Sequence, residues 1–195
     1  MKEYRPLTVD IILCCYNQQQ YVSKAIESIL QQKIDANVRV LVADDCSTDK
    51  TLEVVKSYEP QSPFPFIYLP NQANIGHCKN YQRAFSYCKA DYTAILEGDD
   101  WWQDVNHLSQ HITFLSKHKR YSMSFNRISY YFQDSKESLL RPWPYTKTAH
   151  VTIHLYEQIC FGNQIGNLSA CVFKTELLHT LPEDFFKLNY ADWEL

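Results

Sequence analysis

Short apolar runs alternate with stretches of helical periodicity along the first 118 residues of the chain. Each run is short and ends in polar residues, as buried strands do. The predicted strands are 9–16, 38–43, 66–69 and 92–96. Between them, apolar residues recur at three- or four-residue spacing, which predicts helices with one buried face. These helices are 21–32, a segment carrying Leu52, Val55 and Tyr58, a segment with Tyr81, Ala84, Phe85 and Cys88 facing inward, and 104–118.

The regular alternation of strand and helix predicts βαβ crossovers, and therefore an α/β fold with a mostly parallel sheet. Beyond residue 120 the pattern is less regular. It predicts strands at 121–132 and 168–173, a helix at 153–161 and a proline-containing loop at 141–145. Because no repeat or linker interrupts the chain, we expect one domain over residues 1–195.

Composition narrows the class of protein. The 195 residues are 45% hydrophobic and carry a formal net charge of −3, which argues against disorder and against nucleic acid as a partner. The seven cysteines are scattered and include no C-x-x-C pair, so we expect reduced thiols in a cytoplasmic protein. The four glycines lack the spacing of the common glycine-rich phosphate loops. A nucleotide would therefore have to be held in another way.

Polar residues gather where the predicted strands end. Tyr16 ends the first strand, Asp44 and Asp45 follow the second, and Asp99 and Asp100 follow the fourth. The carboxyl ends of parallel strands meet at one edge of a sheet, where such folds bind ligands. Neighbouring carboxylates repel each other, so a cation should compensate them, and hard oxygen ligands suit Mg²⁺ or Mn²⁺.

Four stretches carry a resemblance to a known family: VDIILCCYNQQQYVSKAIESILQQ, VLVADDCSTDKT, NQANIGHCKNYQRA and DYTAILEGDDWW. They resemble the family 2 glycosyltransferases and occur in the family's order, and ADWEL near the end adds a fifth match. The resemblance implies a GT-A fold, which is a Rossmann-like, mostly parallel sheet flanked by helices. Residues 1–100 would then bind the nucleotide-sugar, and residues 101–195 would face the acceptor.

The resemblance also implies roles for nucleotide-binding residues. Tyr16 matches the aromatic residue that stacks on the base. Asp45 matches the carboxylate that accepts the imide proton of uracil, and Asp44 supports the same turn. Lys79 matches a position that approaches the base or the diphosphate, and Asp99 matches a ribose and metal ligand.

At the reacting end, Asp100 matches the direct metal ligand and Asp192 the catalytic base of an inverting enzyme. Two departures from the family pattern stand out. Glu97 replaces the usual aspartate at the start of the acidic stretch, and the chain ends three residues after Asp192. We therefore expect a catalytic domain that is incomplete on the acceptor side, with peripheral membrane association through regions outside this chain.

These expectations define a metal-dependent transferase that moves a sugar from a nucleotide-sugar, UDP-linked by preference. The acceptor would be a hydroxyl of a glycan or lipid-linked molecule in cell-surface polysaccharide synthesis. A nucleotidyltransferase shares the sheet, the acids and the metal, but normally needs a glycine-rich basic loop near the first strand. A non-catalytic nucleotide-sugar-binding module is the other alternative.

Two other features have structural as well as functional interpretations. His107 and His111 have metal-ligand spacing on one predicted helix, but no third ligand is evident, which favours packing. Trp101 and Trp102 could form a wall of the acceptor site or belong to the core.

Overall fold

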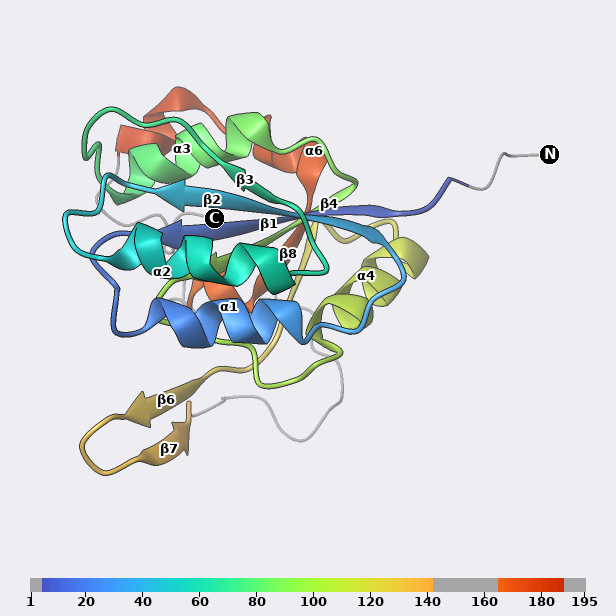
Figure 1. Ribbon diagram of the computed structural model, residues 1–195. Coiled ribbons are helices and arrows are strands. Elements are labelled where there is room, and N and C mark those ends of the chain that lie inside the picture. The colour runs from blue at the N-terminus through green and yellow to red at the C-terminus, as the bar shows by residue number, and fades with distance from the viewer. Residues whose placement is uncertain (1–4, 142–164, 188–195) are drawn as a thin grey trace.

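The computed structural model describes residues 5–141 and 165–187 (Figure 1). Strands and helices alternate as the periodicity predicts. The elements are β1 (Thr8–Cys15), α1 (Val22–Leu30), β2 (Asn37–Asp44), α2 (Thr51–Tyr58), η1 (Glu59–Gln61), β3 (Phe66–Tyr68), α3 (His77–Tyr87), β4 (Tyr92–Glu97), α4 (His107–Lys117), β5 (Met123–Phe125), β6 (Ser129–Phe132), β7 (Glu137–Leu140), η2 (Leu168–Ala170), β8 (Cys171–Lys174), α6 (Thr175–Leu178) and η3 (Glu183–Lys187).

Six strands form one sheet in the order β3-β2-β1-β4-β8-β5. The first four strands of the chain are parallel to one another. β8 pairs antiparallel with β4, and β5 pairs antiparallel with β8. The predicted α/β architecture with a mostly parallel sheet is therefore confirmed.

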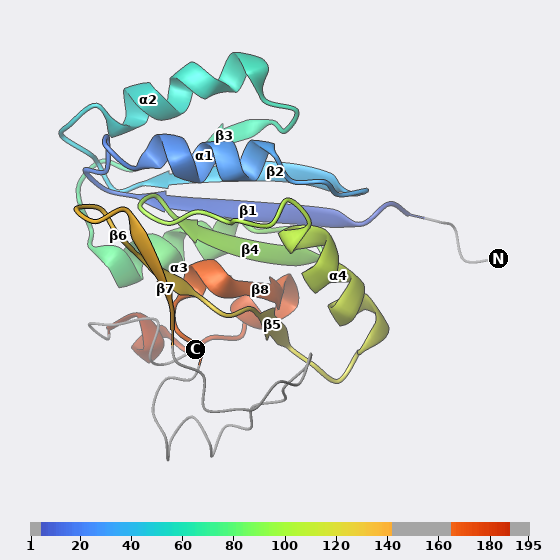
Figure 2. The same ribbon diagram turned by 90° about the horizontal axis from the view of Figure 1, so that it is seen from below.

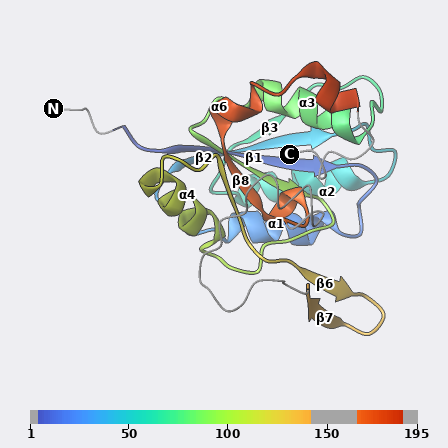
Figure 3. The ribbon, with the colours of Figure 1, turned by 180° about the vertical axis from the view of Figure 1, so that it is seen from behind.

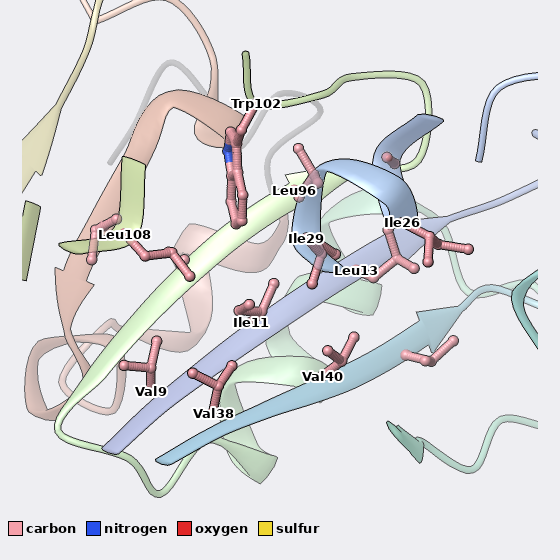
Figure 4. Packing of buried hydrophobic residues seen from close by; sticks show 14 of the residues in the cluster. Val9, Ile11, Leu13, Ile26, Ile29, Val38, Val40, Leu96, Trp102 and Leu108 are labelled. Carbon is pink, nitrogen blue, oxygen red and sulfur yellow. The ribbon is translucent and has the colours of Figure 1, made fainter. Parts of the chain in front are cut away.

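Both faces of the sheet are covered, as apolar runs without strict alternation require. Side chains of a strand point alternately to opposite faces, so Ile11 and Leu13 pack beneath α1, α2 and α4, whereas Ile12 packs against α3, α6 and η3. Figures 1 and 2 show these two helical layers. In Figure 4, Ile26 and Ile29 of α1 lie over the strands. Burying each such side chain contributes roughly 1.5–3 kcal/mol.

The predicted strand segment 121–132 contains two separate strands, β5 and β6. The chain leaves the main sheet after β5, and β6 pairs instead with β7 in a separate two-stranded hairpin (Figure 3). Every residue of β6 and β7 is exposed. The apolar run Tyr130, Tyr131 and Phe132 indicates a strand correctly, but it does not enter the core.

Two other predicted elements begin differently in the structure. The predicted strand 168–173 begins as the 3₁₀ turn η2, and only then forms β8. Helix α4 starts at His107 rather than at 104, because Asp104 accepts hydrogen bonds from the loop before the helix, including the N–H of Asn106 at 2.8 Å. The predicted helix 153–161 and residues 142–145 lie outside the described residues. Among the described helices, none is long and apolar enough to cross a membrane.

Candidate active site at the carboxyl edge of the sheet

Three parallel strands end side by side. In the sheet register, Cys15 of β1 is opposite Asp44 of β2, and Cys14 is opposite Glu97 of β4. Hydrogen bonds continue past the strand ends, with Asp45 N donating to Cys15 O at 2.9 Å and Gly98 N donating to Cys14 O at 2.8 Å. The segments that follow β1, β2 and β4 therefore start from one edge, as the sequence pattern predicts.

A hollow of about 280 Å³ opens at this edge. Tyr16 and Asp45 line it, and so do residues from the start of α3 and the end of β4. The full lining is Cys14, Cys15, Tyr16, Gln18, Asp45, Asn74, Gly76, His77, Asn80 and Glu97. Burial raises the pKa of Cys14 to about 12, so this cysteine stays a neutral thiol. A larger, more open groove between α1 and α2 contains none of the predicted site residues.

Asp45 is 3% exposed and is the most enclosed carboxylate of the hollow. It accepts hydrogen bonds from Asn71 Nδ2 at 2.8 Å, from Ile75 N at 3.0 Å and from Gly76 N at 2.8 Å. Gly76 has a φ of +85°, a left-handed conformation that favours glycine. A carboxylate has about four acceptor positions, so these three donors leave room for one more.

The loop after β1 is fixed by residues that sequence reasoning did not single out as functional. Asn17, with a φ of +53°, accepts a hydrogen bond from Thr48 N at 2.7 Å through Oδ1. Gln18 N donates to Thr51 Oγ1 at 2.7 Å. These bonds tie the loop to the start of α2 and leave Tyr16 44% exposed at the hollow.

The loop after β4 carries the two acids. Asp99 is exposed, and Asp100 is partly buried, with Asn167 Nδ2 donating to its Oδ2 at 2.7 Å. Burial raises the pKa of the Asp100 carboxyl, and the charge of Asp99 raises it further, whereas hydrogen bonds from Ser169 and Asn167 lower it. A group with this environment favours a nearby cation.

Comparison with known proteins assigns the family. A sequence model described as Glycosyl transferase family 2 matches residues 10–172, which is most of the chain. The chain belongs to glycosyl transferase family 2. A curated family relative is the putative teichuronic acid biosynthesis glycosyltransferase TuaG of Bacillus subtilis. It is 27% identical over 135 residues, which cover 69% of this chain and 51% of TuaG. The chain spans about half the length of the curated relatives it matches.

Solved structures share the fold of this family 2 domain. S. aureus TarS 1–349 in complex with UDP has a TM-score of 0.71 at 20% identity, covering 96% of this chain and 53% of that one. The mannosyltransferase PcManGT from Pyrobaculum calidifontis, in complex with GDP-Man and Mn²⁺, has a TM-score of 0.54 at 19% identity. The matched region covers 62% of this chain and 35% of the PcManGT chain. At these identities the likeness confirms the GT-A fold.

Of the remaining predicted residues of the family 2 domain, Asp44 and Lys79 lie outside the lining of the hollow, whereas Glu97 is part of it. Asp44 accepts hydrogen bonds from the N–H and hydroxyl of Ser47, within the turn that follows β2. Lys79 is exposed on α3. Glu97 accepts a hydrogen bond from Tyr81 at 2.9 Å and lies 3.4 Å from His77 Nε2, so it faces α3. Asp192 lies outside the described residues.

The donor set of the acidic loop suits a hard divalent cation. Asp99 and Asp100 offer carboxylate oxygens, and Mg²⁺ commonly uses one or two carboxylates together with substrate phosphates. Asn167 turns its N–H group toward Asp100, so its carbonyl oxygen Oδ1, which is buried and has no hydrogen-bond partner within the described part of the chain, is not counted among the ligands of the cation. The same ranges contain no group of three or more His, Cys, Asp and Glu side chains that could hold a metal alone.

Of the paired histidines and tryptophans, three side chains are packed in the interior and one lies at the surface. His107 stacks on buried Trp102 with ring centroids 4.4 Å apart, and His111 bonds Ser124 Oγ at 2.7 Å. Trp102 and both histidines are therefore packed side chains. Trp101 is partly exposed, and Lys24 Nζ lies 3.3 Å above its ring.

Proposed function

We propose that this domain transfers a sugar from a UDP-sugar to a hydroxyl of a glycan or lipid-linked acceptor, with inversion at the anomeric carbon. The observation that carries the proposal is one hollow at the carboxyl edge. It places exposed Tyr16 beside buried Asp45 and adjoins the strand that leads to Asp99 and Asp100.

The nucleotide subsite is argued from Asp45 and Tyr16. The free acceptor position of Asp45 would receive the imide N–H of uracil, whereas the ring nitrogen of cytosine presents a lone pair there and is repelled. The half-exposed ring of Tyr16 offers a face for stacking, which is typically worth about 1–3 kcal/mol per base. Asp44 would support the turn, and Lys79 would approach the diphosphate from α3. TarS, which shares the fold, has been solved with UDP.

The diphosphate subsite would be the acidic loop. Asp100, with Asp99 beside it, would hold Mn²⁺ or Mg²⁺, as the presence of Mn²⁺ with GDP-Man in PcManGT supports. When bound, such an ion supplies Lewis-acid stabilisation of the charge on the departing diphosphate. Asp99 would also contact the ribose.

The acceptor proton would go to Asp192. Its carboxylate would take the proton from the acceptor hydroxyl as that oxygen attacks the anomeric carbon from the side opposite the diphosphate. One displacement of this kind inverts the configuration. The name of the relative TuaG supports a setting in cell-surface polysaccharide synthesis, with the domain on the cytoplasmic side and peripheral to the membrane.

A thermal-shift panel tests the donor proposal. The protein is heated with UDP, CDP, GDP, UDP-glucose and UDP-N-acetylglucosamine, each with Mn²⁺ or with EDTA. A ligand at a hundredfold excess over Kd stabilises by about 2.7 kcal/mol. We expect stabilisation by UDP and UDP-sugars with Mn²⁺ only. Equal melting temperatures across the whole panel would contradict the proposed function.

A further inference from the structure

A three-residue segment before β8 holds the acidic loop at three points. Ser169 Oγ accepts a hydrogen bond from Glu97 N at 3.0 Å, and Ser169 O accepts one from Trp102 Nε1 at 2.8 Å. Between these two contacts, Asn167 Nδ2 donates to Asp100 Oδ2 at 2.7 Å. The conformation of the loop therefore depends on a segment about 70 residues away in sequence.

The orientation of the Asn167 amide follows from its partner. An ionised carboxylate only accepts hydrogen bonds, so the amide nitrogen must face Asp100 and the amide oxygen must point elsewhere. That oxygen, Oδ1, is buried and has no hydrogen-bond partner among the described residues. Buried polar atoms of native proteins are normally satisfied, and an exception calls for an explanation such as a bound ligand.

We infer that Asn167 belongs to the donor site and uses both ends of its amide. The N–H group positions Asp100 for the cation, and Oδ1 accepts a hydrogen bond from a sugar hydroxyl of the bound nucleotide-sugar. This inference rests on the proposed function. It adds a residue that the acidic stretch itself does not contain.

A hydroxyl explains the free oxygen better than a cation does. The N–H group of Asn167 occupies the side of the amide next to Asp100 Oδ2. A cation shared by that carboxylate oxygen and Oδ1 would lie close to this N–H, which repels positive charge. An O–H donor carries no net charge, so it meets no such conflict. The donor's ribose and its transferred sugar both carry suitable hydroxyls.

The test compares Asn167→Leu, a near-isosteric change, with the matched control Asn126→Leu. Asn126 is an exposed asparagine after β5 whose amide nitrogen donates to Arg127 O. Titration calorimetry with Mn²⁺ measures Kd for UDP and for UDP-glucose, and the EPR signal of free Mn²⁺ measures metal affinity of the UDP complex. Asn167→Ala provides a second variant should the leucine variant fail to fold.

We expect Asn167→Leu to weaken Mn²⁺ binding in the UDP complex about tenfold, and Asn126→Leu to change nothing. The two Kd values are compared at Mn²⁺ concentrations that saturate each variant, so that weaker metal binding does not raise them. An additional tenfold loss for UDP-glucose over UDP then assigns the hydroxyl to the transferred sugar, and an equal loss for both assigns it to the ribose. No loss for either ligand would overturn the hydroxyl contact. Wild-type affinities in both Asn167 variants would overturn the inference. Wild-type protein that binds neither UDP nor UDP-glucose would instead overturn the proposed function.

Discussion

The backbone N–H of Gly76 donates to Oδ2 of Asp45 at 2.8 Å, across 31 positions of sequence. This bond joins the end of β2 to the start of α3 and closes one side of the hollow. Because Asp45 also accepts from Ile75 N and Asn71 Nδ2, the carboxylate that would read the base also holds the wall around it. Specificity and local stability are therefore linked at this residue.

Asp45→Asn is expected to weaken UDP binding at least tenfold and to abolish discrimination between UDP and CDP. One acceptor oxygen becomes an NH₂ group, which opposes the surrounding N–H donors at a typical cost of about 1–3 kcal/mol, so the melting temperature should fall too. Calorimetric titration and melting curves check both effects. Asn71→Ala removes one partner without removing the charge, so it should keep the UDP preference. Comparable Kd values of UDP and CDP for the wild type would remove this assignment.

Asp100→Asn is expected to make UDP binding independent of the metal. The substitution keeps the shape of the side chain but removes the charge that would hold the cation. With Mn²⁺ we expect at least a tenfold rise in Kd for UDP, whereas in EDTA the variant should match the wild type. Wild-type protein that binds UDP equally well with Mn²⁺ and with EDTA would show that the metal assignment is wrong.

Gly98→Ala is expected to weaken UDP binding several-fold through Gln18. An added Cβ would lie 2.5 Å from Gln18 Oε1 and 3.0 Å from Cys15 Cβ, and Gln18 Oε1 accepts a hydrogen bond from Tyr16 N at 3.3 Å. Displacing Gln18 should therefore shift Tyr16. Adding Gln18→Ala to the variant relieves the shorter contact, so the double variant should recover part of the melting temperature. No change in UDP affinity for Gly98→Ala would exclude this route.

His107 should make the fold sensitive to acid. Burial lowers the pKa of His107 from 6.5 to about 2, and the neighbouring His111 adds to the effect. Below pH 6.5, His107 binds a proton in the unfolded chain but stays neutral in the folded protein. The contribution of His107 to stability is therefore complete above pH 6.5 and is lost as the pH falls. One such group lowers the free energy of unfolding by about 2 kcal/mol between pH 7 and pH 5.

His107→Leu removes that group. From pH 7 to pH 5, we expect the free energy of unfolding of the variant to fall by about 2 kcal/mol less than that of the wild type. Urea unfolding at both pH values measures this difference. Identical pH dependence in the two proteins would mean that His107 is protonated in the folded state.

Asp192→Asn tests the proposed base in a protein that shows transfer activity. General-base assistance is typically worth 10²–10⁴-fold in rate, so transfer should nearly disappear while Kd for UDP stays within about threefold, ~0.6 kcal/mol. The matched control is Asp184→Asn, which removes an exposed carboxylate on η3 that precedes Asp192 in the sequence. Full activity of Asp192→Asn would disprove the role, and loss of UDP binding would assign Asp192 to the metal site.

The parallel half of the fold could be predicted from sequence because each strand is marked locally. In β1 and β2, apolar runs of the right length end directly before Tyr16 and at Asp44, so pattern and chemistry fix the same boundary. The mouth of the hollow follows from these boundaries together with the parallel pairing. The bonds that Asp45 makes with Ile75 and Gly76 do not follow, since they depend on how α3 approaches the sheet.

The antiparallel half could not be predicted in this way. In β8, Phe173 pairs with Thr93 of β4 and with Met123 of β5. The sequence around β8 does not indicate which strands it will pair with. For the same reason, the contacts of Asn167 and Ser169 with the acidic loop could not be predicted, because they depend on the position of β8 in the sheet. Only their position just before a short apolar run hinted that they lie near a strand end.

The late position of β8 in the chain also sets an order of events during synthesis. The first four strands and α3 leave the ribosome before Ser169 has been made, about 70 residues after Glu97. At roughly 5–20 residues per second, that interval is about 4–14 s. The edge that carries Tyr16 and Asp45 can thus assemble on the nascent chain while Asp100 still lacks its amide partner. The growing polypeptide would complete the proposed nucleotide subsite first and the proposed cation subsite several seconds later.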